Sequence, residues 1–207
     1  MSSLSSAIIQ EIEAMQEAGQ ATMGYFYFDF RDVSKQHRRD LLISLLFQLS
    51  ARSVPRCGIL SRLYAAHDDG ARQPTDRELA KCLIKMLRNQ RPMYLIIDAL
   101  DESPDNSGIP SPREEVLQLI IELDELRLPD LHICVTSRPH IDIQVALSGL
   151  GPSCFSIGID CRDGHRKDIV DYVTSVVYSN SEPFMRGWEK EEKDLVIETL
   201  SKRADGM

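Results

Sequence analysis

Three carboxylates follow directly after a short apolar run near the middle of the chain. The run at residues 93–97 leads into Asp98, Asp101 and Glu102. A run of this length, rich in β-branched residues, is typical of a strand buried on both faces, as in a parallel sheet. Asp98 would then lie at the carboxyl end of the strand, where open α/β sheets bind their ligands. A carboxylate in that place can hold Mg²⁺, which prefers oxygen ligands and bridges to substrate phosphates.

A second apolar run also ends in polar side chains. Residues 131–135 lead into Thr136, Ser137 and Arg138, and Pro139 then stops the strand. A guanidinium stays charged and binds phosphate oxygens in pairs, so Arg138 is a candidate for contact with a phosphate. The plainer interpretation of the same residue is a surface arginine that pairs with a helix C-terminus.

Taken together, the two strand ends carry a resemblance to a known family. The segments YLIIDALDE at 94–102 and HICVTSRP at 132–139, with a helix between them, closely resemble the NACHT family of STAND-class P-loop NTPases, and fungal NACHT proteins most of all. The resemblance extends to GYFYFDFRD at 24–32, DIVDYV at 168–173 and RADGM at 203–207, so it covers nearly the whole chain.

The resemblance implies a three-layer α/β fold with a parallel sheet of strand order 5-1-4-3-2. Residues 22–28, 94–98, 131–136 and 154–159 would be strands two to five, and strand one, which carries the Walker A loop, would be missing. Strands four and five should therefore flank a vacancy. The resemblance further divides the chain into a truncated nucleotide-binding core, residues 1–159, and the start of a helical subdomain, residues 160–207.

The resemblance also implies roles for the polar strand ends. Asp98, in the Walker B position, would hold Mg²⁺ directly or through water. Glu102, or less readily Asp101, would orient or deprotonate the attacking water, and Arg138 would sense the γ-phosphate of ATP or GTP. In an intact relative, the nucleotide state would govern self-assembly into a homo-oligomer and contacts with repeat domains, as in fungal immune or incompatibility signalling.

One part of the family pattern is missing. The chain contains no G-x-x-x-x-G-K-[ST] run, whose backbone N–H groups and lysine cradle phosphates, and no glycine before Gly19. The first residues resemble the helix that follows this loop, with Ser2 or Ser3 near the Mg²⁺-binding hydroxyl, although no role is assigned to them. We expect an internal piece of a larger protein or a late-starting gene model. We also expect these 207 residues alone not to hydrolyse ATP.

Composition excludes several classes of protein. A net charge of −8 argues against a nucleic-acid-binding surface, which needs clustered Lys and Arg. The first residues show neither the charged region nor the apolar segment of a signal peptide, and no run reaches the roughly 20 apolar residues that a membrane-spanning helix needs. The five cysteines are scattered without a C-x-x-C pair, which is typical of reduced thiols. We therefore expect a cytoplasmic protein that binds neither nucleic acid nor membrane.

Two other functions remain open. In one, the chain has lost the P-loop and serves as a non-catalytic protein-interaction module. Alternatively, the acidic strand end belongs to another Mg²⁺ phosphohydrolase of the haloacid dehalogenase kind. That class has Asp-x-Asp after its first strand, whereas this chain has Asp-x-x-Asp-Glu at a late position. No motif supports a Ser/His or Cys/His nucleophile.

Helical patterns fill most of the remaining sequence. Thr75 with Glu78, and Ser111 with Glu114, match capping boxes that begin helices. The helices are expected at residues 4–18, 40–51, 57–67, 76–88, 112–126, 140–147, 166–178 and 189–203.

Overall fold

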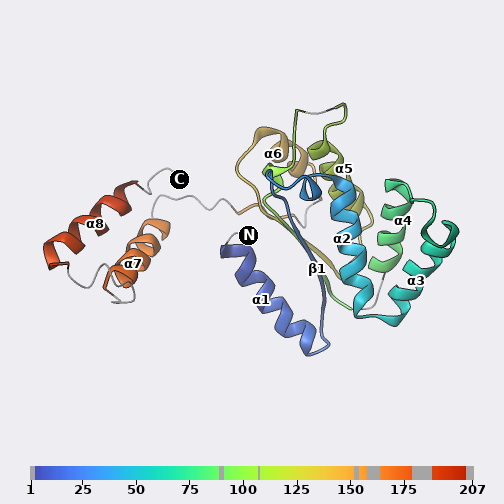
Figure 1. The fold of residues 1–207 in the computed structure, drawn as a ribbon, viewed down its shortest axis with the longest axis horizontal. Helices are drawn as coiled ribbons and strands as arrows, with labels where there is room; N and C mark the ends of the chain where they lie inside the picture. The colour runs from blue at the N-terminus through green and yellow to red at the C-terminus, as the bar shows by residue number, and fades with distance from the viewer. Residues whose placement is uncertain are drawn as a thin grey trace. The chain divides into compact units, whose positions relative to one another are not determined.

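The computed structural model describes residues 3–88, 91–106, 108–151, 154–157, 164–178 and 188–203 (Figure 1). The chain divides into two compact units, Met1–Cys154 and Phe155–Met207. Each unit is described by itself below. The boundary between residues 159 and 160 that the sequence suggests stays a prediction.

A three-stranded parallel sheet lies at the centre of the first unit, in the order β1-β2-β3. The strands are β1 (Thr22–Tyr27), β2 (Met93–Asp98) and β3 (Leu131–Val135), each within one residue of the predicted range at either end. Met93 pairs with both Thr22 and Leu131, so β2 is the central strand. The α/β class and the neighbour order of these three strands are confirmed.

The predicted fifth strand, residues 154–159, is not borne out where it is described. Residues 154–157 form no strand, and residues 158 and 159 lie outside the described part of the chain. Phe155 and Ile157 are each 85% exposed. Apolar residues that alternate along a chain form a strand only where a neighbouring strand and a buried face receive them. Within the described residues, no strand pairs with the outer edge of β3.

Helices cover both faces of the sheet, which gives the three predicted layers (Figure 1). Leu95 and Ile97 of β2 pack into the larger core with α2 (Arg38–Ala51), α4 (Asp76–Leu87) and α5 (Pro112–Glu125). The intervening Ile96 points to the other face, where it packs with Ile9 and Ile12 of α1 (Ser3–Glu17). Alternation along β2 therefore supplies apolar side chains to both layers.

Two further α-helices and three short 3-10 turns belong to the described part of the first unit. α3 (Val54–Ala65) follows α2, and short 3-10 turns lie at η1 (Val33–Lys35), η2 (Asp68–Gly70) and η3 (Leu100–Glu102). α6 (Ile141–Ser148) follows β3 and buries Ile143 in the larger core. Both predicted capping boxes are present, because Thr75 and Ser111 each accept the backbone N–H of a glutamate three residues later.

A side chain of α2 caps part of the outer edge of β1. The Gln48 amide oxygen accepts the backbone N–H of Tyr25 at 3.0 Å, and the Gln48 amide nitrogen donates to the Tyr25 carbonyl at 2.7 Å. These two bonds satisfy backbone groups that would otherwise be available to another strand.

The second unit contains two described helices, α7 (Gly164–Tyr178) and α8 (Lys190–Arg203), where the sequence predicts helices. The Tyr178 hydroxyl donates to Asp194 at 2.8 Å, and the Lys193 ammonium lies 5.4 Å from the centre of the Tyr178 ring. Of the helices that the structure describes, none is both long and apolar enough to cross a membrane.

Candidate functional site at the strand ends

Asp98 is the last residue of β2 and is only 3% exposed. Its Oδ1 atom accepts hydrogen bonds from the Ser5 hydroxyl at the start of α1 and from the Thr136 hydroxyl, the latter at 2.7 Å. Three elements far apart in sequence therefore meet at one carboxylate oxygen. We call Ser5, Asp98 and Thr136 the strand-end site.

The backbone after Asp98 turns sharply to hold this arrangement. Ala99 has φ 55° and ψ 47°, a left-handed conformation that costs free energy for a residue with a Cβ. Its N–H donates to the Thr136 hydroxyl oxygen at 3.0 Å, and the Leu100 N–H donates to the Thr136 carbonyl at 3.0 Å. These bonds join the end of β2 to the end of β3, so Thr136 both orients Asp98 and fixes the turn.

The other predicted site residues lie in the loop beyond the turn. Asp101 accepts the backbone N–H of Arg138 at 3.0 Å, and its other carboxylate oxygen lies 3.5 Å from the Arg138 Nε. Glu102 accepts the backbone N–H of Phe30 at 3.1 Å. The structure thus brings Asp101 and Arg138 together, and it employs both acidic side chains in holding backbone groups.

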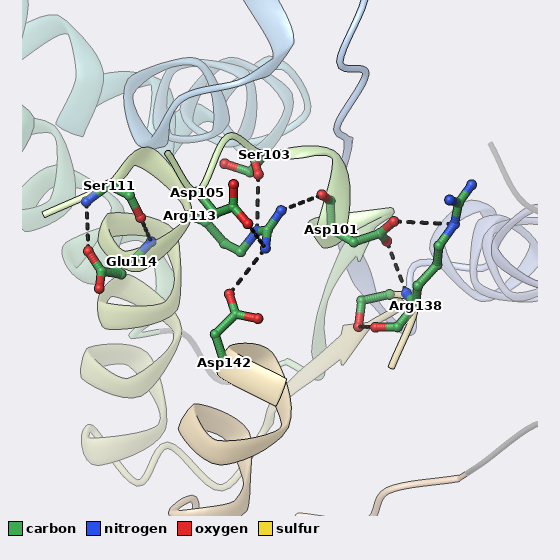
Figure 2. A network of polar contacts seen from close by, with 9 residues as sticks. Asp101, Ser103, Asp105, Ser111, Arg113, Glu114, Arg138 and Asp142 are labelled. Carbon is green, nitrogen blue, oxygen red and sulfur yellow. Dashed lines mark hydrogen bonds and ion pairs between the residues drawn. The ribbon is translucent and has the colours of Figure 1, made fainter. Parts of the chain in front are cut away.

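A buried arginine organises the same loop (Figure 2). Arg113 of α5 is 4% exposed and donates to the carbonyls of Asp101 at 2.7 Å and Ser103 at 3.0 Å. Its Nη1 atom also lies 3.1 Å from carboxylate oxygens of Asp105 and Asp142. We call these five residues the arginine cluster.

Sequence reasoning missed Arg113, although one signal was present. Arg113 occupies the second position of α5, after Ser111 and Pro112. A cation is disfavoured there by the positive end of the helix dipole. An arginine in that position therefore indicates a specific set of acceptors nearby.

Ser5 and Thr136 were also not identified as site residues. Thr136 extends the register in which Ile97 pairs with Val135, so a polar residue beside Asp98 follows from parallel pairing. The sequence pointed instead to Ser2 or Ser3 for the α1 hydroxyl; Ser2 and the Ser3 side chain lie outside the described residues. Ser5 has no signal in the sequence alone, since only the placement of α1 reveals its contact.

The donor set of the strand-end site fits Mg²⁺. Carboxylate and hydroxyl oxygens are the ligands that Mg²⁺ accepts, and it often takes only one or two from protein while phosphates and water supply the rest. Among the described residues, no group of three or more His, Cys, Asp or Glu is placed to hold a metal by itself.

A cysteine of β3, Cys134, lies near the site. Burial raises the pKa of its thiol, and the negative charge of Asp98 raises it further. The raised pKa favours the protonated thiol near neutral pH.

A hollow of about 390 Å³ opens next to the acidic loop. The residues that line it include Phe30, Gln36, Glu102, Asn106, Arg138 and His140. The Arg138 side chain is 80% exposed, so its guanidinium has room to approach an anion without breaking the backbone contact to Asp101.

Comparison with known proteins gives one family. No curated protein and no solved structure matches the chain. The sequence profile described as "Nephrocystin 3, N-terminal" matches residues 2–138, a span that runs from α1 through the strand-end site to Arg138. Because this match covers well over half of the chain, the protein belongs to the Nephrocystin 3, N-terminal family.

Proposed function

We propose that the chain supplies the Mg²⁺ side of a nucleoside-triphosphate switch of the NACHT type, in a cytoplasmic signalling protein. The observation that carries the proposal is the convergence of Ser5 and Thr136 on the buried carboxylate of Asp98. Neighbouring parallel strands place two polar ends together at the edge where α/β folds bind ligands. The family match is compatible with a NACHT relationship without specifying it.

The proposed roles follow from where each side chain lies. Asp98 and the Ser5 hydroxyl would bind Mg²⁺, which neutralises charge on the phosphates of bound ATP or GTP. Arg138, with its exposed guanidinium, would bind the terminal phosphate. Glu102, next to the hollow, would orient a water molecule once a nucleotide displaces its contact with the Phe30 N–H.

Phosphate affinity would depend on a cradle that these 207 residues do not contain. Backbone N–H groups and a lysine supply most of the phosphate-binding energy in P-loop NTPases. Titration calorimetry of the chain with MgATP and MgGTP should therefore give a Kd no tighter than about 100 μM. A low-micromolar isotherm for the unmodified chain would contradict this account of the phosphate contacts.

The decisive test adds a phosphate-binding segment of the P-loop type. A G-x-x-x-x-G-K-[ST] strand and loop fused before Met1 should bring the Kd for MgATP or MgGTP into the low-micromolar range. The matched control carries the same fusion with the loop lysine changed to alanine. If both fusions bind as weakly as the unmodified chain, the strand-end site is not a nucleotide site.

A second candidate function is a protein-interaction module without catalysis. Ile43 and Phe47 lie one turn apart on α2 and are 47% and 70% exposed, which favours contact with another protein surface. Sedimentation velocity of the chain and of Phe47→Ser separates the candidates. A self-associating chain that Phe47→Ser turns into a monomer, together with fusions that bind no nucleotide, would establish the module.

A further inference from the structure

Arg113 of α5 binds two segments outside its own helix, the loop after β2 and the start of α6. Its guanidinium reaches two carbonyls in the loop after β2, at Asp101 and Ser103, and the Asp142 carboxylate at the start of α6. A planar guanidinium with five N–H donors can serve all of these acceptors at once. The contact to Asp142 joins the loop after β2 to the helix after β3.

These contacts close a ring of interactions (Figure 2). Arg138 donates its backbone N–H to the Asp101 side chain, and the Asp101 carbonyl accepts from Arg113. Arg113 binds Asp142, which lies only four residues after Arg138 along the chain. The ring therefore fixes Asp101, Arg138 and the first turn of α6 as one body.

We infer that Arg113 is a positioning residue that couples α6 to the two polar strand ends through the ring of Asp101, Arg138 and Asp142. A displacement of α6 would pull on Arg113 through Asp142 and thereby shift Asp101 and Arg138. The use of this coupling by a nucleotide rests on the proposed function; the coupling itself does not need a nucleotide. Movement of α6 then shifts the backbone from which the Arg138 side chain extends.

Asp105 offers a matched control inside the same cluster. Asp105 and Asp142 contact the same Nη1 atom of Arg113 at the same distance, 3.1 Å. Asp105, however, belongs to the loop between η3 and α5. Its contact with Arg113 therefore lies within the same loop that Arg113 already binds through Asp101 and Ser103, and it does not reach α6. Loss of Asp105 should loosen only that loop, whereas loss of Asp142 should open the ring.

The test is residue-resolved amide hydrogen exchange on the whole chain without nucleotide. Asp142→Asn should speed exchange roughly tenfold at the amides of Arg138 and Ser103, since hydrogen bonds to charged groups of this kind are lost. Arg113→Lys should do the same, because an ammonium lacks the planar fork. Asp105→Asn should leave the Arg138 amide at the parent rate.

The double variant Arg113→Lys with Asp142→Asn shows whether the two substitutions act on Arg138 through one ring of contacts or through two independent ones. Members of one ring act as a unit, so the double variant should exchange no faster at Arg138 than either single variant. Additive acceleration, or an Asp142→Asn effect confined to α6, would overturn the inference. If Arg113→Lys does not fold, Asp142→Asn against Asp105→Asn still decides it. Because exchange is measured without nucleotide, this result does not depend on whether the chain binds one, and a failure here is distinct from a failure of the proposed function.

Discussion

The strand-end site and the arginine cluster lie on the same loops but bind their carboxylates and carbonyls in different ways. Asp98 accepts from two neutral hydroxyls, those of Ser5 and Thr136. The arginine cluster instead gathers its acceptors around the buried guanidinium of Arg113, although the carboxylates of Asp105 and Asp142 stay largely exposed. One region is held by donors that can rotate, and the other by a permanent cation.

This difference supports the proposal of a cation site at Asp98 and not at the arginine cluster, which already contains a cation. A hydroxyl both donates and accepts, so Ser5 can turn a lone pair toward an arriving ion. A guanidinium only donates, and its charge repels a second cation. We therefore expect Asp101 to serve the loop structure and the proposed cation site to lie at Asp98.

The largest expected effect is on stability, at the arginine cluster. Arg113→Met should lower the free energy of unfolding by about 2–3 kcal/mol, because the carbonyls of Asp101 and Ser103 and the Asp142 carboxylate lose a charged donor. Urea unfolding followed by circular dichroism measures this free energy.

Arg72→Met is the control. Arg72 pairs with Asp68 at 3.9 Å, and the two side chains are 63% and 78% exposed, so the substitution should change the free energy of unfolding little. Equal losses of unfolding free energy in the two variants would mean that Arg113 stabilises the fold no more than an exposed ion pair does.

A smaller effect is expected at the strand-end site. Thr136→Val keeps the shape of the side chain but removes the donor to Asp98 and the acceptor for the Ala99 N–H. The loss should be about 1–2 kcal/mol in the same unfolding assay. Ser137→Ala should stay within about 0.5 kcal/mol, because the Ser137 hydroxyl is exposed and bonds only to the adjacent carbonyl of Arg138. If Thr136→Val is as stable as the parent, the hydrogen bonds of Thr136 do not hold the strand-end site together.

The smallest effect is a pH dependence of the arginine cluster. Burial raises the pKa of Asp142, but the hydrogen bond and charge of Arg113 and the Ile143 N–H outweigh it, so the pKa lies below the usual 3.8. A carboxyl with a lowered pKa stabilises the fold above its unfolded value and loses that contribution as the pH falls through the folded value. Stability should therefore drop below about pH 4.

Asp142→Asn checks this pH dependence, because an amide does not titrate. The acid-side fall in the unfolding free energy should be shallower in Asp142→Asn than in the parent chain. Asp105→Asn is measured alongside as the variant of the other carboxylate at the same guanidinium. Identical curves for Asp142→Asn and the parent would show that the contact between Asp142 and Arg113 does not contribute to the free energy of unfolding.

Local patterns predicted the elements, and contacts distant in sequence completed the site. The apolar run before Asp98 and the pairs Thr75–Glu78 and Ser111–Glu114 specify strands and helix starts through nearest neighbours, and the structure agrees. The contact of Ser5 with Asp98 joins residues 93 positions apart, so no local rule reveals it.

The same reasoning explains the one strand that was wrong. Residues 154–157 carry apolar side chains, but a strand is specified by its neighbour and its buried face as much as by its own sequence. Arg113 shows the opposite case, since an unfavourable position on α5 becomes stable only through acceptors from two other segments.

The most direct test of the account is a pair of carboxylate variants in the chain fused to a G-x-x-x-x-G-K-[ST] segment. Titration calorimetry with MgATP and MgGTP should show that Asp98→Asn weakens nucleotide binding roughly ten- to a hundredfold, whereas Asp101→Asn leaves it within about threefold of the parent. The account assigns the cation to the strand-end site, and this is the result it predicts. Loss of affinity in Asp101→Asn with full retention in Asp98→Asn would contradict it.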